Sequence, residues 1–108
     1  MLELKDFEAA YNKVQEVVLP TKLIKSDYFS DQTGNDVYLK PENMQLTGAY
    51  KIRGAYYKIS TLSEEEKAKG LITASAGNHA QGVALAAARQ GVKATIVMPT
   101  TTPLLKVN

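Results

Sequence analysis

The chain has 108 residues, and its 13 lysines and arginines against 11 aspartates and glutamates give a net charge of +2 at neutral pH. This length suits one small domain, and the basic residues are scattered rather than clustered, which disfavours nucleic acid as a partner. The chain has no cysteine and a single histidine, His79. A disulfide framework and a thiolate nucleophile are therefore excluded, and no metal site is expected.

The longest apolar run covers only residues 83–88, and the N-terminus carries acidic residues without the apolar segment of a secretion signal. A run of this length is far too short to span a bilayer. We therefore expect a soluble, cytoplasmic protein with no membrane partner.

The first half of the chain alternates periodic and turn-rich segments. Asp6 is placed to cap an amphipathic helix over residues 7–18, which Pro20 would end. The turn-forming stretch "SDQTGND" precedes an alternating segment, and together they predict a hairpin with its second strand at 36–40. After the loop "PENMQLTG", apolar residues recur at helical spacing, so a helix is expected to begin at about Lys51.

The second half has the order strand, helix, strand. Ser63 and Glu66 form a capping-box pattern at the start of a short helix that Gly70 would end. "LITA" and "KATIVM" are typical of brief strands, and "HAQGVALAAARQ" between them is typical of a helix. This predicts a βαβ unit over about 71–98 with parallel strands, and hence the α/β class. Two strands followed by the first turn of a further helix leave apolar faces uncovered, so we expect a piece of a longer fold.

The stretch "SAGNHAQG" lies at the junction of a strand and a helix, and two interpretations remain open. Backbone N–H groups at a helix N-terminus could bind an anion such as a phosphate or a carboxylate. Alternatively, the stretch is a tight turn with Asn78 as the helix cap. Neither the phosphate loop with a lysine after its glycines nor the G-x-G-x-x-G fingerprint occurs in the chain. No serine or aspartate pattern points to His79 as a catalytic base.

Lys51 is placed unfavourably for the helix dipole, so it is either a solvated charge or a reactive amine. An amine becomes nucleophilic when an apolar pocket or nearby cations lower its pKa, and it then forms a Schiff base with a carbonyl group. Tyr50, Arg53 and Tyr57 could supply such an environment. The loop before the helix offers three more polar side chains, which we interpret as a wall of the site rather than as solvated residues: Lys40, Glu42 and Asn43.

Three stretches in this order, "LKPENMQLTGAYKIRGAYYKI", "TASAGNHAQGVALAA" and "IVMPTTTPLLKV", resemble the fold type II pyridoxal-phosphate enzymes. The resemblance is nearest to the threonine dehydratases and extends to serine racemase and serine dehydratase. It runs from about residue 19 to the end and implies a fragment of the tryptophan synthase β-like fold, the first third of such an enzyme. One departure is Ala49-Tyr50 before the lysine, where the family often has Ser-Phe.

The resemblance implies roles for individual residues. Lys51 would form the Schiff base with pyridoxal 5'-phosphate and act as the catalytic base, and Asn78 would bind the ring hydroxyl of the cofactor. A loop would hold the substrate carboxylate, largely through backbone N–H groups: Ser75, Ala76, Gly77, Asn78 and His79. The implied reaction converts threonine, and serine, to a 2-oxo acid and ammonia.

The resemblance also implies the organisation of the whole enzyme. Residues 1–66 would begin the large cofactor-binding domain, and residues 67–108 would form an incomplete small domain. The later glycine-rich loop that holds the cofactor phosphate lies outside these 108 residues, so the isolated chain is expected to be inactive and the full-length enzyme a homo-oligomer. The alternatives are serine racemase, another fold type II enzyme, or a truncated non-catalytic binding module.

Overall fold

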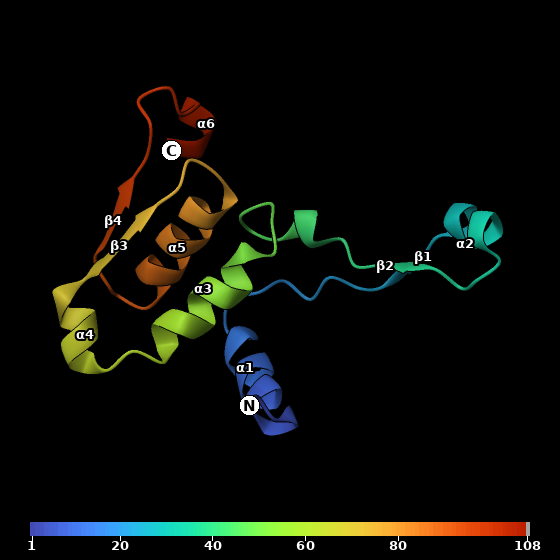
Figure 1. Cartoon of the computed structure of the whole chain (residues 1–108), viewed down its shortest axis with the longest axis horizontal. Coiled ribbons are helices and arrows are strands. Elements are labelled where there is room, and N and C mark those ends of the chain that lie inside the picture. The colour runs from blue at the N-terminus through green and yellow to red at the C-terminus, as the bar shows by residue number, and fades with distance from the viewer. Residues whose placement is uncertain (108) are drawn as a thin grey trace.

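The computed structural model describes residues 1–107 and has the α/β architecture shown in Figure 1. The elements, in chain order, are α1 (Leu4–Val14), β1 (Ile24–Lys25), α2 (Asp27–Thr33), β2 (Tyr38–Leu39), the 3-10 helix η1 (Glu42–Met44), α3 (Lys51–Ser60), α4 (Glu64–Lys69), β3 (Leu71–Ala74), α5 (Asn78–Arg89), β4 (Ala94–Val97) and α6 (Leu104–Val107). No helix within residues 1–107 is long and apolar enough to cross a membrane.

The predicted βαβ unit is confirmed. Strands β3 and β4 are parallel, with Leu71 beside Ala94 and Ala74 beside Val97, and α5 connects them. Parallel strands need a crossover of this kind because the chain must return to the same end of the sheet. The carboxyl end of β3 therefore leads directly into the start of α5, which is where the "SAGN" turn lies.

The hydrophobic core lies between α3 and α5, with α1 and the turn after it closing one side. Helix α5 contributes small side chains, so its backbone comes close to α3, and Ile52 of α3 is fully buried there. The buried core residues are Val14, Val17, Val18, Ile52, Ala55, Tyr56, Ile59, Val83, Ala86, Ala87 and Val92. The phenol of Tyr56 donates a hydrogen bond to Glu16 at 2.7 Å, which ties α3 to the end of α1.

Helix α1 differs from the prediction at both ends. It begins at Leu4 and its cap is Glu3, while Asp6 lies in the first turn and accepts a hydrogen bond from the Glu3 backbone N–H at 2.8 Å. Asp6 is therefore the far partner of a capping box rather than the cap itself. The helix ends at Val14, well before Pro20, and an irregular turn buries the valines that follow.

The predicted hairpin exists, but its connection is not a turn. Strands β1 and β2 pair antiparallel, with Ile24 opposite Leu39, and α2 lies between them. The Ser26 hydroxyl caps α2 by accepting from the Phe29 N–H at 3.3 Å, and Gly34 ends it with φ of 66°. The turn-forming residues of this stretch thus serve as helix caps, which is the other conformation that their chemistry favours.

Residues 22–40, which we call the arm, project from the rest of the chain, which we call the body (Figure 1). The radius of gyration is 16.7 Å, whereas a compact chain of this length has about 13 Å. The difference reflects the arm, whose two short strands and α2 have no buried residue.

Candidate functional site

Lys51 is the first residue of α3, as the sequence predicts. The chain enters this helix through a tight bend at Gly48, which has φ of 68°, a left-handed conformation that favours glycine. The Lys51 side chain is exposed, and its ammonium group lies 5.2 Å from the centre of the Tyr50 ring. The sequence before the helix therefore places a lysine with an exposed side chain at the first position of α3.

Gly82 brings the start of α3 against the first turns of α5. A methyl group at Gly82 would lie 3.1 Å from the Lys51 carbonyl carbon and 3.2 Å from the Lys51 Cβ atom. Both distances are shorter than ordinary carbon contacts, so a side chain at this position would require the start of α3 to shift by a few tenths of an ångström. Asn78 lies four residues before Gly82 and therefore on the same face of α5. The two residues predicted to bind the cofactor, Lys51 and Asn78, thus start two helices that face each other.

The loop before α5 is fixed by Ser75. Its hydroxyl accepts hydrogen bonds from the Gly77 and Ala80 N–H groups, both at 3.3 Å, and its own N–H donates to the Val97 carbonyl at 3.0 Å. The helix cap is Gly77, so the interpretation of Asn78 as the cap is wrong: Asn78 is the first helical residue. In an α-helix the first N–H groups have no partner within the helix. Those of Asn78 and His79 accordingly have no acceptor within α5.

Asn78 and His79 are both exposed, but they have different neighbours. The His79 side chain lines a pocket of about 290 Å³ between α3 and β3, which also includes Lys58 and Thr73. The Asn78 side chain instead accepts a hydrogen bond from Lys106 at its Oδ1 atom, at 2.9 Å. His79 therefore borders this pocket, whereas the Asn78 amide is bound by α6.

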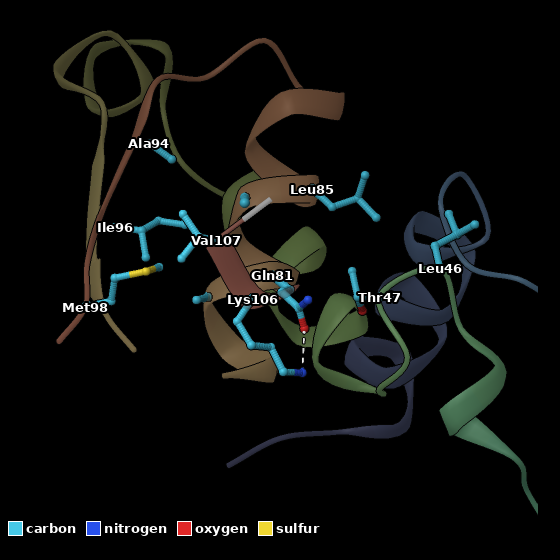
Figure 2. A pocket seen from close by; sticks show the side chains of 11 residues that line it. Leu46, Thr47, Gln81, Leu85, Ala94, Ile96, Met98, Lys106 and Val107 are labelled. Atoms are coloured by element: carbon cyan, nitrogen blue, oxygen red, sulfur yellow. Dashed lines mark hydrogen bonds between the residues drawn. The ribbon is translucent and has the colours of Figure 1, made fainter. Parts of the chain in front are cut away.

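Lys106 is a residue of this region that sequence reasoning does not single out. It lies in α6, and its ammonium also donates to the Gln81 Oε1 atom at 3.1 Å, as Figure 2 shows. Lys106 and Gln81 line a pocket of about 710 Å³, together with Leu46 and Thr47 from the loop before α3. Only the "PLLK" stretch after a proline hints at the position of Lys106, and it carries no signal for a contact 28 residues away.

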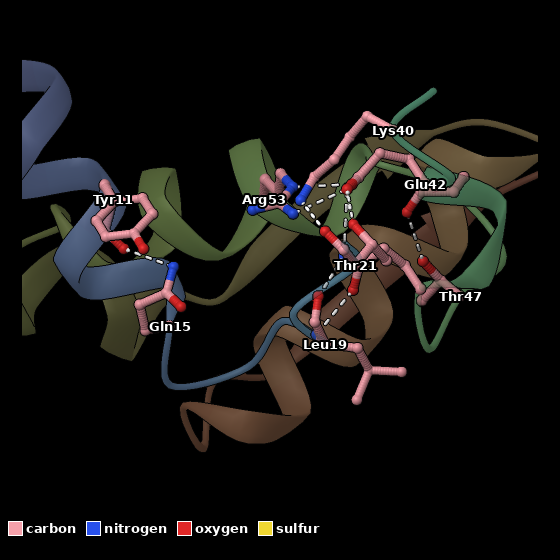
Figure 3. Close-up of polar contacts among 10 residues, drawn as sticks. Tyr11, Gln15, Leu19, Thr21, Lys40, Glu42, Thr47 and Arg53 are labelled. Carbon is pink, nitrogen blue, oxygen red and sulfur yellow. Dashed lines mark hydrogen bonds and ion pairs between the residues drawn. The ribbon is translucent and has the colours of Figure 1, made fainter. Parts of the chain in front are cut away.

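The loop before α3 is held to that helix by an ion pair between Glu42 and Arg53 (Figure 3). The guanidinium donates two hydrogen bonds of 2.8 Å to the carboxylate, and Thr21 adds a third at 2.9 Å. Chiefly because Arg53 binds it, the pKa of Glu42 falls from 4.5 to about 2. The charge of Arg53 is thus compensated by Glu42, which corrects the expectation that Arg53 supplies a cationic environment for Lys51.

Buried Gln45 completes this attachment. Its side-chain amide accepts from the Leu19 N–H and donates to the Leu19 carbonyl, both at 2.9 Å, so it pairs with the backbone as a neighbouring strand would. Lys40 donates to the Thr21 carbonyl. Of the three residues predicted to form a wall of the site, Lys40 and Glu42 therefore bind the chain around residues 19–21, and Asn43 is exposed.

A family model described as "Pyridoxal-phosphate dependent enzyme" matches residues 14–108, and the chain belongs to this family. It is 54% identical to the L-threonine ammonia-lyase of Thermotoga maritima over 107 residues, covering 99% of this chain and 27% of that protein. The chain thus corresponds to the N-terminal region of the threonine dehydratases it matches and spans under a third of their length.

Solved structures give the same result. The processed form of threonine deaminase isoform 2 from Solanum lycopersicum superposes with a TM-score of 0.81 at 43% identity, covering 98% of this chain and 31% of that one. The serine racemase of Dictyostelium discoideum superposes with a TM-score of 0.91 at 36% identity, covering 99% of this chain and 35% of that one. The fold is therefore that of the tryptophan synthase β-like pyridoxal-phosphate enzymes.

The residues present fit two of the polar groups of pyridoxal phosphate. The exposed amine of Lys51 suits its aldehyde, and the exposed amide of Asn78 suits its ring hydroxyl. A side-chain carbon at Gly77 would meet no atom within 4 Å, so this loop borders open space in which a ligand can lie. The phosphate group has no counterpart, because the seven glycines of the chain are spread singly rather than gathered in a loop.

Proposed function

We propose that this chain is the N-terminal portion of a pyridoxal-phosphate-dependent threonine dehydratase. The full-length enzyme would convert L-threonine to 2-oxobutanoate and ammonia, and L-serine to pyruvate and ammonia. The observation that carries the proposal is the approach of the Lys51 backbone to Gly82, which places an exposed lysine one helical turn from Asn78. The 54% identity to an L-threonine ammonia-lyase over almost the whole chain supports the choice of reaction.

The residues of this chain would share the chemistry as follows. Lys51 would bind the aldehyde through Nζ, and Asn78 would donate to the ring hydroxyl. The backbone N–H groups of Asn78 and His79 would bind the substrate carboxylate, because they lie at the positive end of the α5 dipole. Pyridoxal phosphate, when bound, supplies an electron sink for negative charge on the carbon beside the substrate amine.

When the substrate amine replaces Lys51 at the aldehyde, the released amine of Lys51 would take the proton from that carbon, since it would be the basic group nearest to the bound substrate. Removal of this proton and of the β-hydroxyl group eliminates one water from threonine and leaves an enamine. Hydrolysis of the enamine consumes one water and releases ammonia, so the net products are 2-oxobutanoate and ammonia.

The proposal is tested by chemical labelling of the full-length protein. The protein is saturated with pyridoxal phosphate and reduced with borohydride, and the labelled lysine is identified by peptide mapping. We expect the label on Lys51, and none on Lys58, an exposed lysine of the same helix. A label on any other lysine would contradict the assignment.

The isolated 108-residue chain provides a second test. Because it lacks a glycine-rich loop for the phosphate group, it should bind the cofactor poorly and turn over no threonine. Steady production of 2-oxobutanoate by the purified chain would show that the residues outside it are not required.

Serine racemase is the second candidate, and the TM-score of 0.91 to the Dictyostelium discoideum serine racemase favours it. Lys51 and Asn78 would serve both reactions, since each begins with removal of the same proton. The two are separated by giving L-serine to the full-length protein and measuring D-serine and pyruvate. A dehydratase yields chiefly pyruvate, and a racemase yields D-serine.

For the complete protein we further propose a cytoplasmic homo-oligomer in which residues 1–66 begin the large domain and residues 67–108 begin the small one. Within the described residues both parts contribute to one core through α3 and α5. The two domains would therefore separate only in the complete enzyme, where additional chain would cover the sheet and the arm.

A further inference from the structure

Lys106 bridges two side chains on α5 although it lies in a different element, α6. Its Nζ atom is 2.9 Å from the Asn78 Oδ1 atom and 3.1 Å from the Gln81 Oε1 atom. Asn78 and Gln81 are three residues apart, so both lie on the side of α5 that α6 approaches. Lys106 is half-buried and lines the same pocket as Gln81, as Figure 2 shows. Two hydrogen bonds therefore fix the position of its ammonium group.

The contact fixes which end of the Asn78 amide is available to a ligand. A side-chain amide has one end that accepts and one that donates, and the two are similar in shape, so a free amide can present either end. A lysine ammonium has three donors and no acceptor, so only the carbonyl oxygen of Asn78 can face Lys106. The two hydrogens on Nδ2 then point away from Lys106, which leaves them for a ligand.

We propose that Lys106 is a positioning residue for Asn78: it locks the amide so that Nδ2 donates to an anionic oxygen of the ligand. The inference rests on the proposed function, in which this oxygen is that of the deprotonated ring hydroxyl of the cofactor. A flipped amide would turn its own oxygen towards that group and repel it. Gln81 supports this arrangement because its Oε1 atom is a second acceptor for the Lys106 ammonium, which keeps the lysine side chain from turning into solvent.

The competing explanation is that Lys106 merely fastens α6 to α5. Both roles would make Lys106 matter for stability, but only the positioning role makes its effect on the ligand depend on Asn78. A double-mutant cycle separates them, because two residues that act through one hydrogen bond are not additive.

The experiment uses the full-length protein freed of cofactor, and it measures the dissociation constant of pyridoxal phosphate by absorbance titration. The absorption maximum of the bound cofactor is recorded as well. We expect Lys106→Met to weaken binding about tenfold, the size of a charge-assisted hydrogen bond, and to shift the maximum. Lys106→Arg, which keeps the donor, should recover most of the affinity. Lys93→Met, which removes an exposed lysine beyond α5, should change neither quantity.

The same substitution in an Asn78→Ala background decides the question. If Lys106 acts through Asn78, Lys106→Met should then change the dissociation constant less than about twofold, within the usual limits of additivity. An equal loss in both backgrounds, or no loss in either, overturns the proposal. Should Lys106→Met fail to fold, Lys106→Leu, which also lacks a donor, takes its place with the same criteria. Borohydride labelling of Lys51 in each variant distinguishes a failure of this inference from a failure of the proposed function.

Discussion

The arm and the body contain similar apolar side chains, but only the body buries them. In the body, Ile52 is fully buried and the alanines of α5 pack against α3. In the arm, Ile24 is 53% exposed and Tyr28 is 69% exposed, and no residue from 19 to 44 is buried. Two isolated strands of this kind are marginally stable in water. The comparison shows that local hydrogen bonding gives the arm its shape, whereas burial of apolar surface stabilises the body.

The arm joins the body through polar contacts rather than through a shared core. Both of its ends reach the cluster formed by Thr21, Glu42 and Arg53, and Gln45 fastens the Leu19 backbone beside it. These ties lie next to α3, the helix that begins with Lys51. The position of the arm and the position of the candidate site therefore depend on the same loop.

The largest expected effect tests this difference in burial. Ile52→Ala removes three carbons from a site with no solvent exposure and should lower the free energy of unfolding of the 108-residue chain by about 3 to 4 kcal/mol. Tyr28→Ala removes a larger side chain from the arm and should cost less than about 1 kcal/mol. Urea denaturation of both variants measures the two values. Similar losses would mean that the arm is part of the same core as the body.

A second substitution tests the close approach within the body. Gly82→Ala places a methyl group 3.1 Å from the backbone of Lys51, which cannot move without shifting α3, so we expect a loss of about 2 kcal/mol. Gly54→Ala is the matched control on α3, because its methyl group would meet no atom within 4 Å. Alanine favours helices, so this control should be neutral or stabilising by up to about 1 kcal/mol. Urea denaturation of the 108-residue chain measures both values. A Gly82→Ala chain as stable as the parent, together with an unchanged cofactor affinity of the full-length variant, would contradict the role given to this glycine.

The body could be predicted from the sequence because its local and long-range signals agree. The capping box of Ser63 and Glu66, the glycine after α4 and the four-residue strand β3 all appear where the pattern predicts them. Lys51 also starts its helix as expected. In α3 the residue types that favour the helix also bury its apolar face in the core. Helix α4 has no buried residue, and its capping residues alone mark where it begins and ends.

The remaining features depend on contacts that no local pattern encodes. In the arm, the same serine and glycine residues that favour a turn also favour helix caps, and nothing buried decides between them, so α2 was missed. The contact of Lys106 with Asn78 spans 28 residues and depends on how α6 packs. The sequence suggests Arg53 as a cationic neighbour of Lys51. Its actual partner, Glu42, lies on a loop whose path the sequence does not reveal.

The attachment of the arm should weaken in acid. The pKa of Glu42 is lowered to about 2 in the folded chain, mainly by Arg53, from an ordinary value of 4.5. A carboxylate with a lowered pKa stabilises the fold above about pH 4.5, and this contribution is lost as the pH falls towards 2. We expect a loss on the order of 1 to 2 kcal/mol, since the pair is partly exposed. Urea denaturation between pH 6 and about pH 2.5 measures it.

Two variants show whether this pair is responsible. Glu42→Gln removes the titrating group, and Arg53→Met removes the main cause of the lowered pKa. Both should be less stable than the parent chain at pH 6, and both should lose less stability on acidification. An unchanged pH dependence in Glu42→Gln would assign the effect to other carboxylates.

The smallest effect is the sharpest test of whether the arm and the body unfold separately. Gly34 ends α2 and Gly91 follows α5, both have φ of 66°, and neither has an atom within 4 Å of an added methyl group. Alanine should therefore cost each position the same local strain, about 1 kcal/mol. If the arm opens by itself, Gly91→Ala lowers the global free energy of unfolding, while Gly34→Ala only speeds amide hydrogen exchange within α2. Equal losses of global stability in the two variants would show that the polar cluster at Glu42 couples the arm fully to the core.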